Sequence, residues 1–317
     1  MRDLLSFFAL EPVLVDVGAS AGPPHIWAPI AANSTYVGFD PDARAMTDAA
    51  QGIYRKTIIV NEAVTSDSNV AEVRFYLTRS PVCSSTLEPD AAALSNYHFH
   101  ALFETEREAM VRASTLDAIL LRLGLGRVDW LKCDTQGTDL RIFRSLGDKL
   151  QRGVLALDVE PGLIDVYRGE DLFVDAHKHA VANGFWLSRL DVQGAVRVRD
   201  ASLQAVFRGA EDLAACARRA IRGSPGWCEA RYLRTVEFLA ESDAARDQYA
   251  LLWLFSLLDD QPGFALDVAL DYERRFGGDA WSERMRKEAT LRIVRGQRFA
   301  VLTRAKSWVR RVAGWPA

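Results

Sequence analysis

The stretch VLVDVGASAG, residues Val13–Gly22, decides the fold class. Its first five residues form an apolar run around Asp16, which is typical of a buried strand, and Gly18 then opens a tight loop of small residues. Such residues let a ligand approach the backbone closely, and the pair Pro23-Pro24 suits the first turn of a following helix. A glycine loop between a strand and a helix predicts ligand binding at the carboxyl end of an α/β sheet.

Further apolar runs predict the other strands of this sheet, at residues 35–39, 57–60, 70–77, 128–133, 154–159, 185–190 and 203–207. Helices are expected between them at residues 114–123, 138–146 and 173–183. The last helix is closed by Gly184. This alternation indicates an α/β fold with a mostly parallel, doubly wound sheet and helices on both faces, and the last two runs predict a hairpin at one edge.

The pattern changes near residue 210. From there on it predicts helices of roughly 12–16 residues, separated by glycine-containing breaks at residues 223–226, 261–263 and 276–278. We therefore expect two domains, an α/β domain over residues 1–210 and an α-helical C-terminal domain over residues 211–317.

The composition is that of an ordinary soluble globular protein, with 317 residues, 49% hydrophobic and 26% charged. A net charge of −3 gives no drive toward nucleic acid. The four cysteines show no CxxC spacing, which favours a reducing cytoplasm over secretion. No run reaches the ~18 apolar residues of a membrane span, and the N-terminus does not have the pattern of a signal peptide.

The end of the chain is basic. After Glu288 there are seven basic residues and no acidic one: Arg292, Arg295, Arg298, Arg304, Lys306, Arg310 and Arg311. Apolar residues from Phe299 to Val312 recur three or four apart, which predicts an amphipathic helix. Two interpretations of residues 292–315 stay open: peripheral contact with an anionic membrane or a lipid-linked acceptor, and a last helix packed on the domain with its arginines in water, which we favour.

The strand ends indicate which ligand the loop holds. Ser20 stands where a dinucleotide fingerprint requires its second glycine, and no Gly-Lys-Ser/Thr of a phosphate loop follows. Asp16 before the glycines suits an ammonium group, and Asp40 at the end of the next strand suits both hydroxyls of a ribose. Glu62 and Ala63 follow the third strand and are placed to contact an adenine edge. The set predicts a site for a cationic amino acid nucleoside.

Five ordered segments resemble the FkbM-type S-adenosylmethionine-dependent methyltransferases: VDVGASAG (15–22), YVGFDPD (36–42), VNEAVTSDSN (60–69), STLDAIL (114–120) and VDWLKCDTQGTDLRIFRSL (128–146). The hallmark of that family is Lys-x-Asp-x-x-Gly-x-Glu, which stands here at Lys132 to Asp139. Gln136 replaces the usual Glu, and Asp139 replaces the second Glu of the family. The resemblance covers residues 10–210.

The resemblance implies a seven-stranded, Rossmann-like class I methyltransferase sheet. It also implies S-adenosyl-L-methionine over the ends of strands one to four, with S-adenosyl-L-homocysteine as product. By position, the implied cofactor-binding residues are Asp16, Gly18, Ala19 and Ser20 for the methionine part, Asp40 for the ribose, Glu62 and Ala63 for the adenine, and Asp134 beside the methyl group.

Methyl transfer to a hydroxyl needs in-line alignment and a base near the hydroxyl proton. Lys132 and Asp134 share strand parity, as do Asp158 and Glu160 on the next strand, so both pairs are expected at one cleft. We expect Asp134 to act as the base or orienting group, with Glu160 behind it. An ion pair between Lys132 and Asp158 under the loop is an equal alternative.

Other side chains are weaker candidates for the site. His98 or His100 is expected to enter it from the long loop after Leu87, and Cys83 is expected to be a lid contact. His177 and His179 lie on a predicted helix, where residues two apart point in different directions, so we expect them at the surface. The carboxylates also suit a divalent metal, but no further ligand is fixed by spacing, so no metal is assigned.

The sequence therefore predicts a cytoplasmic O-methyltransferase that acts on a hydroxyl, first of a sugar in a glycan or glycolipid and next of a natural product. The helical domain is expected to serve acceptor recognition, homodimer formation or attachment to a glycan-assembly complex. An alternative from another class is a non-catalytic, methyltransferase-like scaffold that works through its helical domain, which the departures at Gln136 and Asp139 keep open. A dehydrogenase is disfavoured by the glycine spacing.

Overall fold

The structure is a computed structural model that describes residues 2–42 and 50–312, with side chains up to residue 297. These residues belong to two compact units, Met1–Thr235 and Val236–Ala317. We describe each unit by itself.

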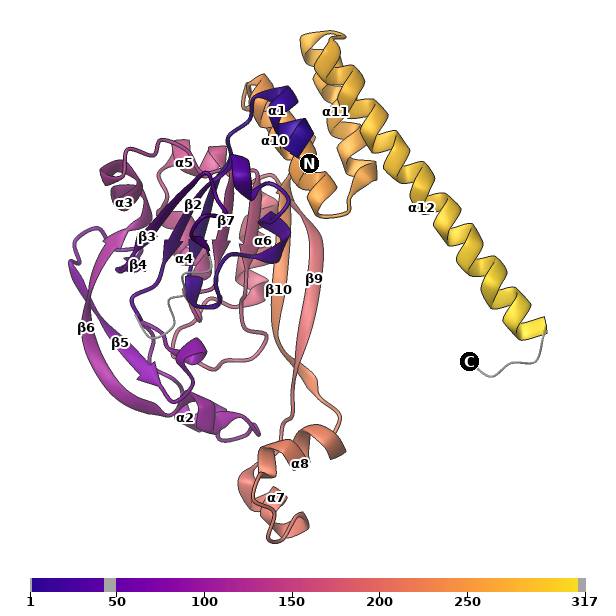
Figure 1. Ribbon diagram of the computed structural model, residues 1–317. Coiled ribbons are helices and arrows are strands. Elements are labelled where there is room, and N and C mark those ends of the chain that lie inside the picture. The colour runs from indigo at the N-terminus through magenta and orange to yellow at the C-terminus, as the bar shows by residue number, and fades with distance from the viewer. Residues whose placement is uncertain (1, 43–49, 313–317) are drawn as a thin grey trace. The chain divides into compact units, whose positions relative to one another are not determined.

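A seven-stranded sheet forms the centre of the first unit, in the order β3-β2-β1-β7-β8-β10-β9 (Figure 1). Five strands run parallel to one another: β1 (Val13–Val17), β2 (Thr35–Phe39), β3 (Lys56–Val60), β7 (Trp130–Cys133) and β8 (Ala156–Val159). The antiparallel strands β10 (Ser224–Arg234) and β9 (Phe185–Ala195) complete one edge. The predicted mostly parallel sheet is thus confirmed, and its strand order reverses between β1 and β7, where such sheets bind ligands.

Helices cover one face of this sheet. The helices of the first unit are α1 (Arg2–Phe8), α2 (Ala91–Leu94), α3 (Leu116–Arg122), α4 (Asp139–Ser145), α5 (Asp148–Gly153), α6 (Phe173–Ala182), α7 (Asp200–Val206) and α8 (Leu213–Ala220). Leu116 of α3, Phe143 of α4 and Ala180 of α6 share one buried cluster with Val15 and Val37 of the sheet. The three helices predicted from the sequence are therefore present and form the core.

The other face is not covered by the helix expected after Pro23-Pro24. That segment forms short 3₁₀ turns at Ala19–Ala21, His25–Trp27 and Ala31–Asn33. Pro29 explains the difference, because proline lacks the N–H of a helix interior and clashes with the preceding turn. The fully buried indole of Trp27 covers the sheet instead, with its ring centroid 6.0 Å from that of Trp130.

The hairpin and the domain boundary differ from the prediction. Residues 203–207 are not a strand, because Leu203 belongs to α7 and packs in a small cluster with Val196 and Ala217. A short apolar run does not distinguish strand from helix by itself. The partner of β9 is β10, which also pairs with β8 inside the central sheet. The boundary expected near residue 210 is therefore wrong, and the first unit ends at Thr235.

A second sheet was not expected. It has the order β4-β6-β5 and consists of β4 (Ala63–Thr65), β5 (Glu72–Thr78) and β6 (Thr105–Thr115). The run at residues 70–77 is thus a strand, as predicted, but it pairs with β6 and not with the main sheet.

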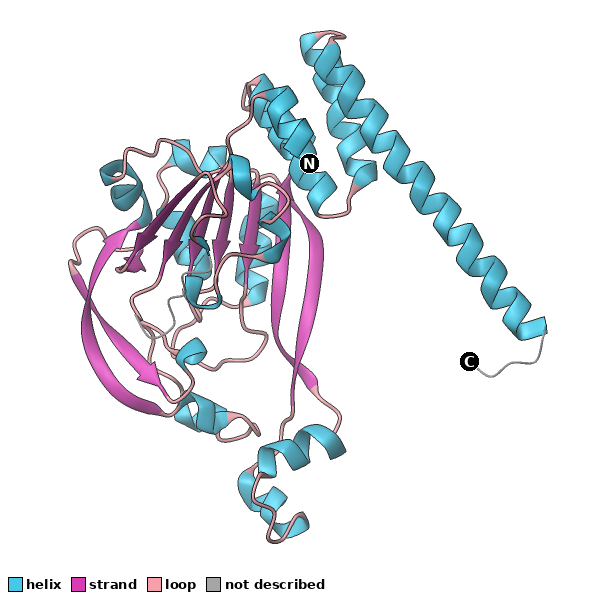
Figure 2. Ribbon diagram, in the orientation of Figure 1, coloured by secondary structure: helices cyan, strands magenta, loops and turns pink. Residues whose placement is uncertain are grey.

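The second unit is helical over its described residues (Figure 2). Its helices are α9 (Val236–Glu241), α10 (Arg246–Leu258), α11 (Pro262–Phe276) and α12 (Ala280–Val312). Trp253 of α10 donates its indole N–H to the carbonyl of Met285 on α12, at 3.2 Å. The apolar stripe predicted from Phe299 onward lies outside the residues whose side chains are described, and Trp315 lies outside the described chain. Within the described chain, no helix is long and apolar enough to cross a membrane.

The last residue of β10 fixes the end of the sheet. Arg234 is 2% exposed and donates from Nε to the carbonyl of Val154 at 2.8 Å. Its two terminal nitrogens donate to the carbonyls of Asn183 and Gln151, and its guanidinium lies 3.7 Å from the ring centroid of Phe185. Burial lowers the pKa of Arg234 to about 9. One planar side chain therefore bonds three carbonyl groups from three separate segments of the chain.

We expect Arg234→Lys to lower the free energy of unfolding by about 2 kcal/mol or more, because an ammonium group does not reach three carbonyls at once and leaves buried acceptors unpaired. Urea unfolding followed by circular dichroism measures the change. Arg107→Lys, at an exposed position of β6, is the matched control. Equal stability of the two variants would contradict this role of Arg234.

Candidate active site

A cavity of about 480 Å³ opens where the parallel strands end. Each of these strands contributes a residue that follows it directly or by two positions: Gly18, Asp40, Glu62, Asp134 and Glu160. The remaining wall comes from the loops after β7 and β8, from the segment between β5 and β6 and from the β9–β10 hairpin. The cavity therefore lies at the switch point of the sheet, as the sequence predicts for the ligand site.

The loop after β1 packs directly on the end of β7. Gly18 has φ +87°, and a Cβ built on it would lie 1.9 Å from the carbonyl oxygen of Asp134. Its N–H donates to the carbonyl of Phe39 at 2.9 Å. Only glycine fits this left-handed position. Gly18 and Ser20 line the cavity, whereas Ala19 is buried beneath it and is not part of the wall.

Asp16 lies below the cavity and not in its wall. The side chain is fully buried and accepts hydrogen bonds from the hydroxyl of Tyr36 and from Nζ of Lys132, each at 3.1 Å. Burial raises the pKa of Asp16 to about 6, against the opposing effect of Lys132. The predicted contact of Asp16 with a ligand ammonium is therefore not supported, because an ammonium of the chain itself occupies that carboxylate.

The ion pair expected between Lys132 and Asp158 is wrong, although the two residues are register partners on β7 and β8. Nζ of Lys132 donates to the carboxylates of Asp16 and Asp134, and it lies 3.4 Å from Oδ2 of Asp134. Asp158 instead accepts from Arg231 of β10, with nitrogen–oxygen distances of 2.8 and 2.9 Å. Lys132 and Asp158 thus each pair with a residue of the strand on their other side. The second cation, Arg231, comes from β10, which was not among the predicted strands.

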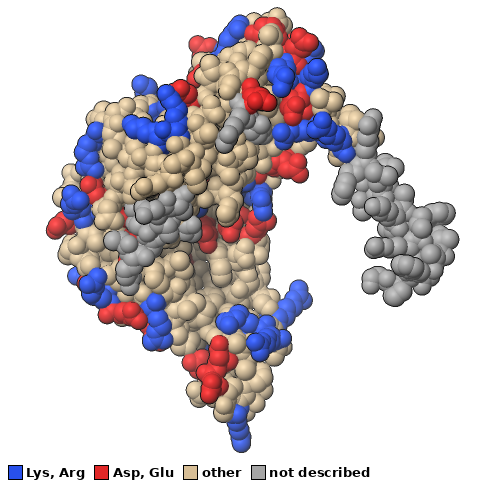
Figure 3. Space-filling view, in the orientation of Figure 1, with Lys and Arg blue, Asp and Glu red and all other residues tan. Residues whose placement is uncertain are grey.

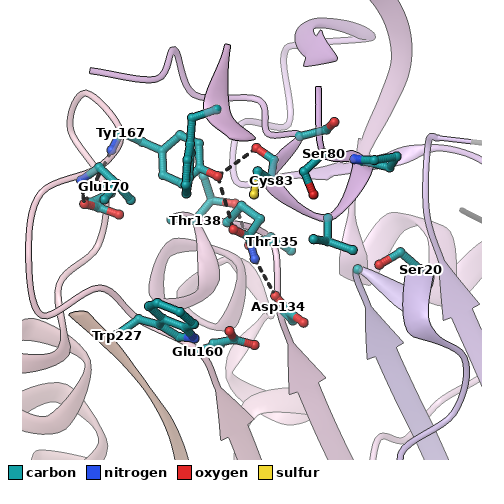
Figure 4. A pocket seen from close by; sticks show the side chains of 18 of the residues that line it. Ser20, Ser80, Cys83, Asp134, Thr135, Thr138, Glu160, Tyr167, Glu170 and Trp227 are labelled. Carbon is teal, nitrogen blue, oxygen red and sulfur yellow. Dashed lines mark hydrogen bonds between the residues drawn. The ribbon is translucent and has the colours of Figure 1, made fainter. Parts of the chain in front are cut away.

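Asp134 and Glu160 form a carboxyl pair in the cavity wall. Asp134 directly follows β7, and Glu160 directly follows β8. Burial and the charge of Asp134 raise the pKa of Glu160 well above its usual range, which favours the protonated form of Glu160. Asp134 also accepts from Nε2 of Gln136 at 2.9 Å. Figure 4 shows the two carboxyl groups close together, with the indole of Trp227 beside Glu160.

The two departures from the family hallmark have definite contacts. Gln136 has φ +57°, and its Oε1 accepts from the hydroxyl of Tyr167 at 3.1 Å. Asp139 is buried and accepts from the backbone N–H groups of Thr135 and Glu160, at 2.9 and 2.8 Å. Burial raises the pKa of Asp139 to about 6. Gln136 thus orients Asp134, and Asp139 ties the loop after β7 to the end of β8.

The residues expected to hold a nucleoside line another part of the cavity wall. Asp40 is 6% exposed and accepts from the N–H of Asp42 at 2.7 Å. Burial raises the pKa of Asp40 to about 6. Glu62 and Ala63 also line the cavity, and Glu62 pairs with Arg122 at 2.9 Å.

His98 lines the cavity, but its Nδ1 accepts from the N–H of Val196 at 3.3 Å. Burial and the charge of Arg218 lower the pKa of His98. His100 lies outside the cavity wall and pairs with Asp200 at 2.9 Å. Cys83 lines the cavity, and burial raises the pKa of its thiol to about 11. Within the described ranges, no group of three or more His, Cys, Asp or Glu is arranged to hold a metal ion.

Several wall residues were missed from the sequence. Trp227 was assigned to a helix and instead lies on β10, with its ring centroid 6.3 Å from that of Phe99. Phe103, Tyr167 and Arg218 also line the cavity. The signal available in the sequence is the alternation of apolar and charged residues along Cys228-Glu229-Ala230-Arg231-Tyr232, which has the period of a strand.

We expect Gly18→Ala to destabilise the protein much more than Gly124→Ala. Both glycines have positive φ, which costs alanine about 1–2 kcal/mol, but a Cβ at Gly124 meets nothing within 4 Å. The clash with Asp134 adds about 1–3 kcal/mol at Gly18 only. Urea unfolding of both variants measures the difference. Similar losses would show that the two loops are not in close contact.

The comparison with known protein families agrees with this geometry. The model of the methyltransferase FkbM domain matches residues 16–194, which is more than half of the chain. No curated protein and no solved structure matches the chain. The match includes the loop after β1 and the Asp134–Glu160 pair, and it ends within β9, before β10 and the helical unit. The resemblance inferred from the sequence is thereby confirmed: the chain belongs to the FkbM methyltransferase family.

Proposed function

We propose that this protein transfers a methyl group from S-adenosyl-L-methionine to a hydroxyl, and that the hydroxyl belongs to a sugar of a glycan or glycolipid. The observation that carries the proposal is the neighbouring pair of carboxyl groups on Asp134 and Glu160 (Figure 4), which shares one cavity with the glycine loop and Asp40. The cavity thus combines a nucleoside-type site with a proton acceptor.

The residues present fit this cofactor. Gly18 exposes backbone at the cavity where any side chain would be excluded, so a ligand can approach the strand end closely. The carboxylate of Asp40 lies at the position that accepts ribose hydroxyls in sheets of this type. Ala63 and Val64 offer an apolar surface to an adenine ring. The cofactor-binding set that we propose therefore contains Gly18, Ser20, Asp40, Glu62, Ala63 and Asp134, without Asp16.

The carboxyl pair supports a defined direction of proton transfer. When bound, S-adenosylmethionine supplies an electrophilic methyl group on a sulfonium. The chain has to align the hydroxyl and accept its proton. Lys132 and Gln136 both donate hydrogen bonds to the carboxylate of Asp134, whereas the pKa of Glu160 is raised, so we assign Asp134 as the proton acceptor. Glu160, in its protonated form, is assigned to orient that carboxylate.

Lys132 keeps its charge in this arrangement. Burial acts to lower the pKa of Lys132, but the carboxylates of Asp134 and Asp16 act more strongly to raise it, so the net change is upward. Lys132 therefore acts as a fixed cation below the pair. His98 has its Nδ1 occupied by a backbone donor, so Nε2 carries the ring proton, which suits a hydrogen-bond donor to the acceptor and not a base.

The aromatic wall supports a sugar as acceptor. Trp227, Phe99 and Phe103 form connected ring contacts beside Glu160, and the apolar face of a pyranose packs well on such rings. The contacts of Gln136 and Asp139 keep the carboxyl groups of Asp134 and Glu160 in place, which supports a catalytic function over that of a non-catalytic scaffold. A cytoplasmic location, a homodimer and a membrane contact through residues 292–315 stay predictions.

Calorimetry with S-adenosylmethionine and S-adenosylhomocysteine tests the cofactor site. We expect micromolar binding that Asp40→Asn weakens at least tenfold, because the amide loses one acceptor for the ribose hydroxyls. Asp165→Asn, an exposed position outside the cavity, should bind as the intact protein does. The absence of binding in the intact protein would overturn the proposal.

The same titration has an expected pH dependence. The pKa of Asp40 in the folded protein is raised to about 6 by burial, so Asp40 is ionised above that pH and becomes protonated below it. The affinity of the intact protein should therefore fall between pH 7 and pH 5. The affinity of Asp40→Asn should stay nearly constant over that range. A parallel decline in both proteins would assign the effect to another group.

Substitution of the carboxyl pair tests the chemistry. We expect Asp134→Asn to lower kcat by ~10²–10⁴ because the proton acceptor is lost. Glu160→Gln should lower kcat less, since the amide still donates a hydrogen bond to Asp134. Methyl transfer is followed by the S-adenosylhomocysteine released from a panel of glycan acceptors. A larger loss in Glu160→Gln than in Asp134→Asn would reverse the two roles.

A further inference from the structure

The β9–β10 hairpin carries a helical insertion at its tip. This insertion, residues 196–223, contains α7 and α8, which pack together through Val196, Leu203 and Ala217. It is fastened to the segment that bears His98. The N–H of His98 donates to the carbonyl of Val196 at 3.1 Å, and Arg199 donates to Asn96 at 3.0 Å. These bonds make the insertion a fixed part of the cavity wall.

One charged residue of the insertion reaches the cavity. Arg218 of α8 is the only Lys or Arg among the described residues that line it. The charge of Arg218 acts on His98, whose pKa it helps to lower, so the two side chains lie near each other. Arg218 is exposed, and no carboxylate of the described chain forms an ion pair with it. Its guanidinium therefore remains available to a ligand.

Acidic and basic side chains lie on different parts of the cavity surroundings. The carboxyl groups stand at the strand ends, on Asp40, Asp42, Glu62, Asp134 and Glu160, and on the loop at Glu170. The insertion carries arginine at positions 197, 199, 208, 218, 219 and 222, and only Asp200, Glu211 and Asp212 oppose them, which leaves it at 6 − 3 = +3. In Figure 3 Lys and Arg side chains gather over α8. A positive field at the acceptor side attracts anionic ligands to it.

We propose that the acceptor carries an anionic group, a carboxylate or a phosphate, and that Arg218 binds this group while the hydroxyl to be methylated lies at Asp134. This inference rests on the proposed function and names its substrate class, an acidic or phosphorylated saccharide. A guanidinium at the cavity wall binds either anion with two parallel hydrogen bonds, which fixes orientation as well as charge. The nearby aromatic rings contact the uncharged part of the same molecule.

The test compares acceptor probes that differ in charge. Protein saturated with S-adenosylhomocysteine is titrated with methyl β-glucoside, methyl β-glucuronide and glucose 1-phosphate, and binding is followed by ligand-observed NMR. We expect at least one anionic probe to bind at least tenfold tighter than the neutral glucoside. Arg218→Gln should abolish that preference. Arg219→Gln, its exposed neighbour on the same helix, lies outside the cavity wall and should retain it.

The outcomes are decisive. A preference for glucuronide assigns the anion as a carboxylate, and one for glucose 1-phosphate assigns it as a phosphate. Three results would overturn the inference: equal affinity for neutral and anionic probes, no binding of either anionic probe at millimolar concentration, or an unchanged preference in Arg218→Gln. Binding of S-adenosylhomocysteine is measured first in each variant, so a failure of the acceptor inference is distinguished from a failure of the proposed cofactor site.

Discussion

A row of charged side chains across four neighbouring strands underlies the whole site. Asp16, Lys132, Asp158 and Arg231 are register partners on β1, β7, β8 and β10, with alternating charge. Within the row, Lys132 pairs with Asp16 and Arg231 with Asp158. An unpaired charge at this depth would cost several kcal/mol, ~3–5 for loss of one partner. The row therefore fixes which strands lie side by side and holds a cation directly below Asp134.

The catalytic geometry follows from that row by one further layer of contacts. Lys132 reaches upward from the row to Asp134, and Gln136 reaches back to the same carboxylate from the loop after β7. Asp139 joins that loop to the end of β8, so Asp134 and Glu160 face each other. The replacement of glutamate by Gln136 and Asp139 thus keeps a donor and a buried carboxylate where this arrangement requires them. The pair is preorganised before any ligand binds.

The wall opposite the strand ends has a different origin from the sheet. It includes the segment between β5 and β6 and the hairpin insertion, which are joined through His98 and Val196. The FkbM domain match ends within β9, so the whole of this insertion, including Arg218, lies beyond the matched residues. A shared cofactor frame with a separate acceptor wall is what allows one fold to serve different acceptors.

The sequence by itself determined the parallel strands, the glycine loop and the carboxylates that follow β2, β3, β7 and β8. These features are local: an apolar run, a left-handed glycine and a strand-end residue are each visible within a few positions. It did not determine that Lys132 pairs with Asp16, or that Asp158 pairs with Arg231 and not with Lys132. Nor did it determine that Trp227 and Arg218 reach the cavity. The partner of Asp158 and the position of Trp227 depend on β10, which joins the sheet from 65 residues beyond β8, and Asp16 meets Lys132 across 116 residues of chain. Such long-range pairing is decided by burial and charge partners in the folded chain.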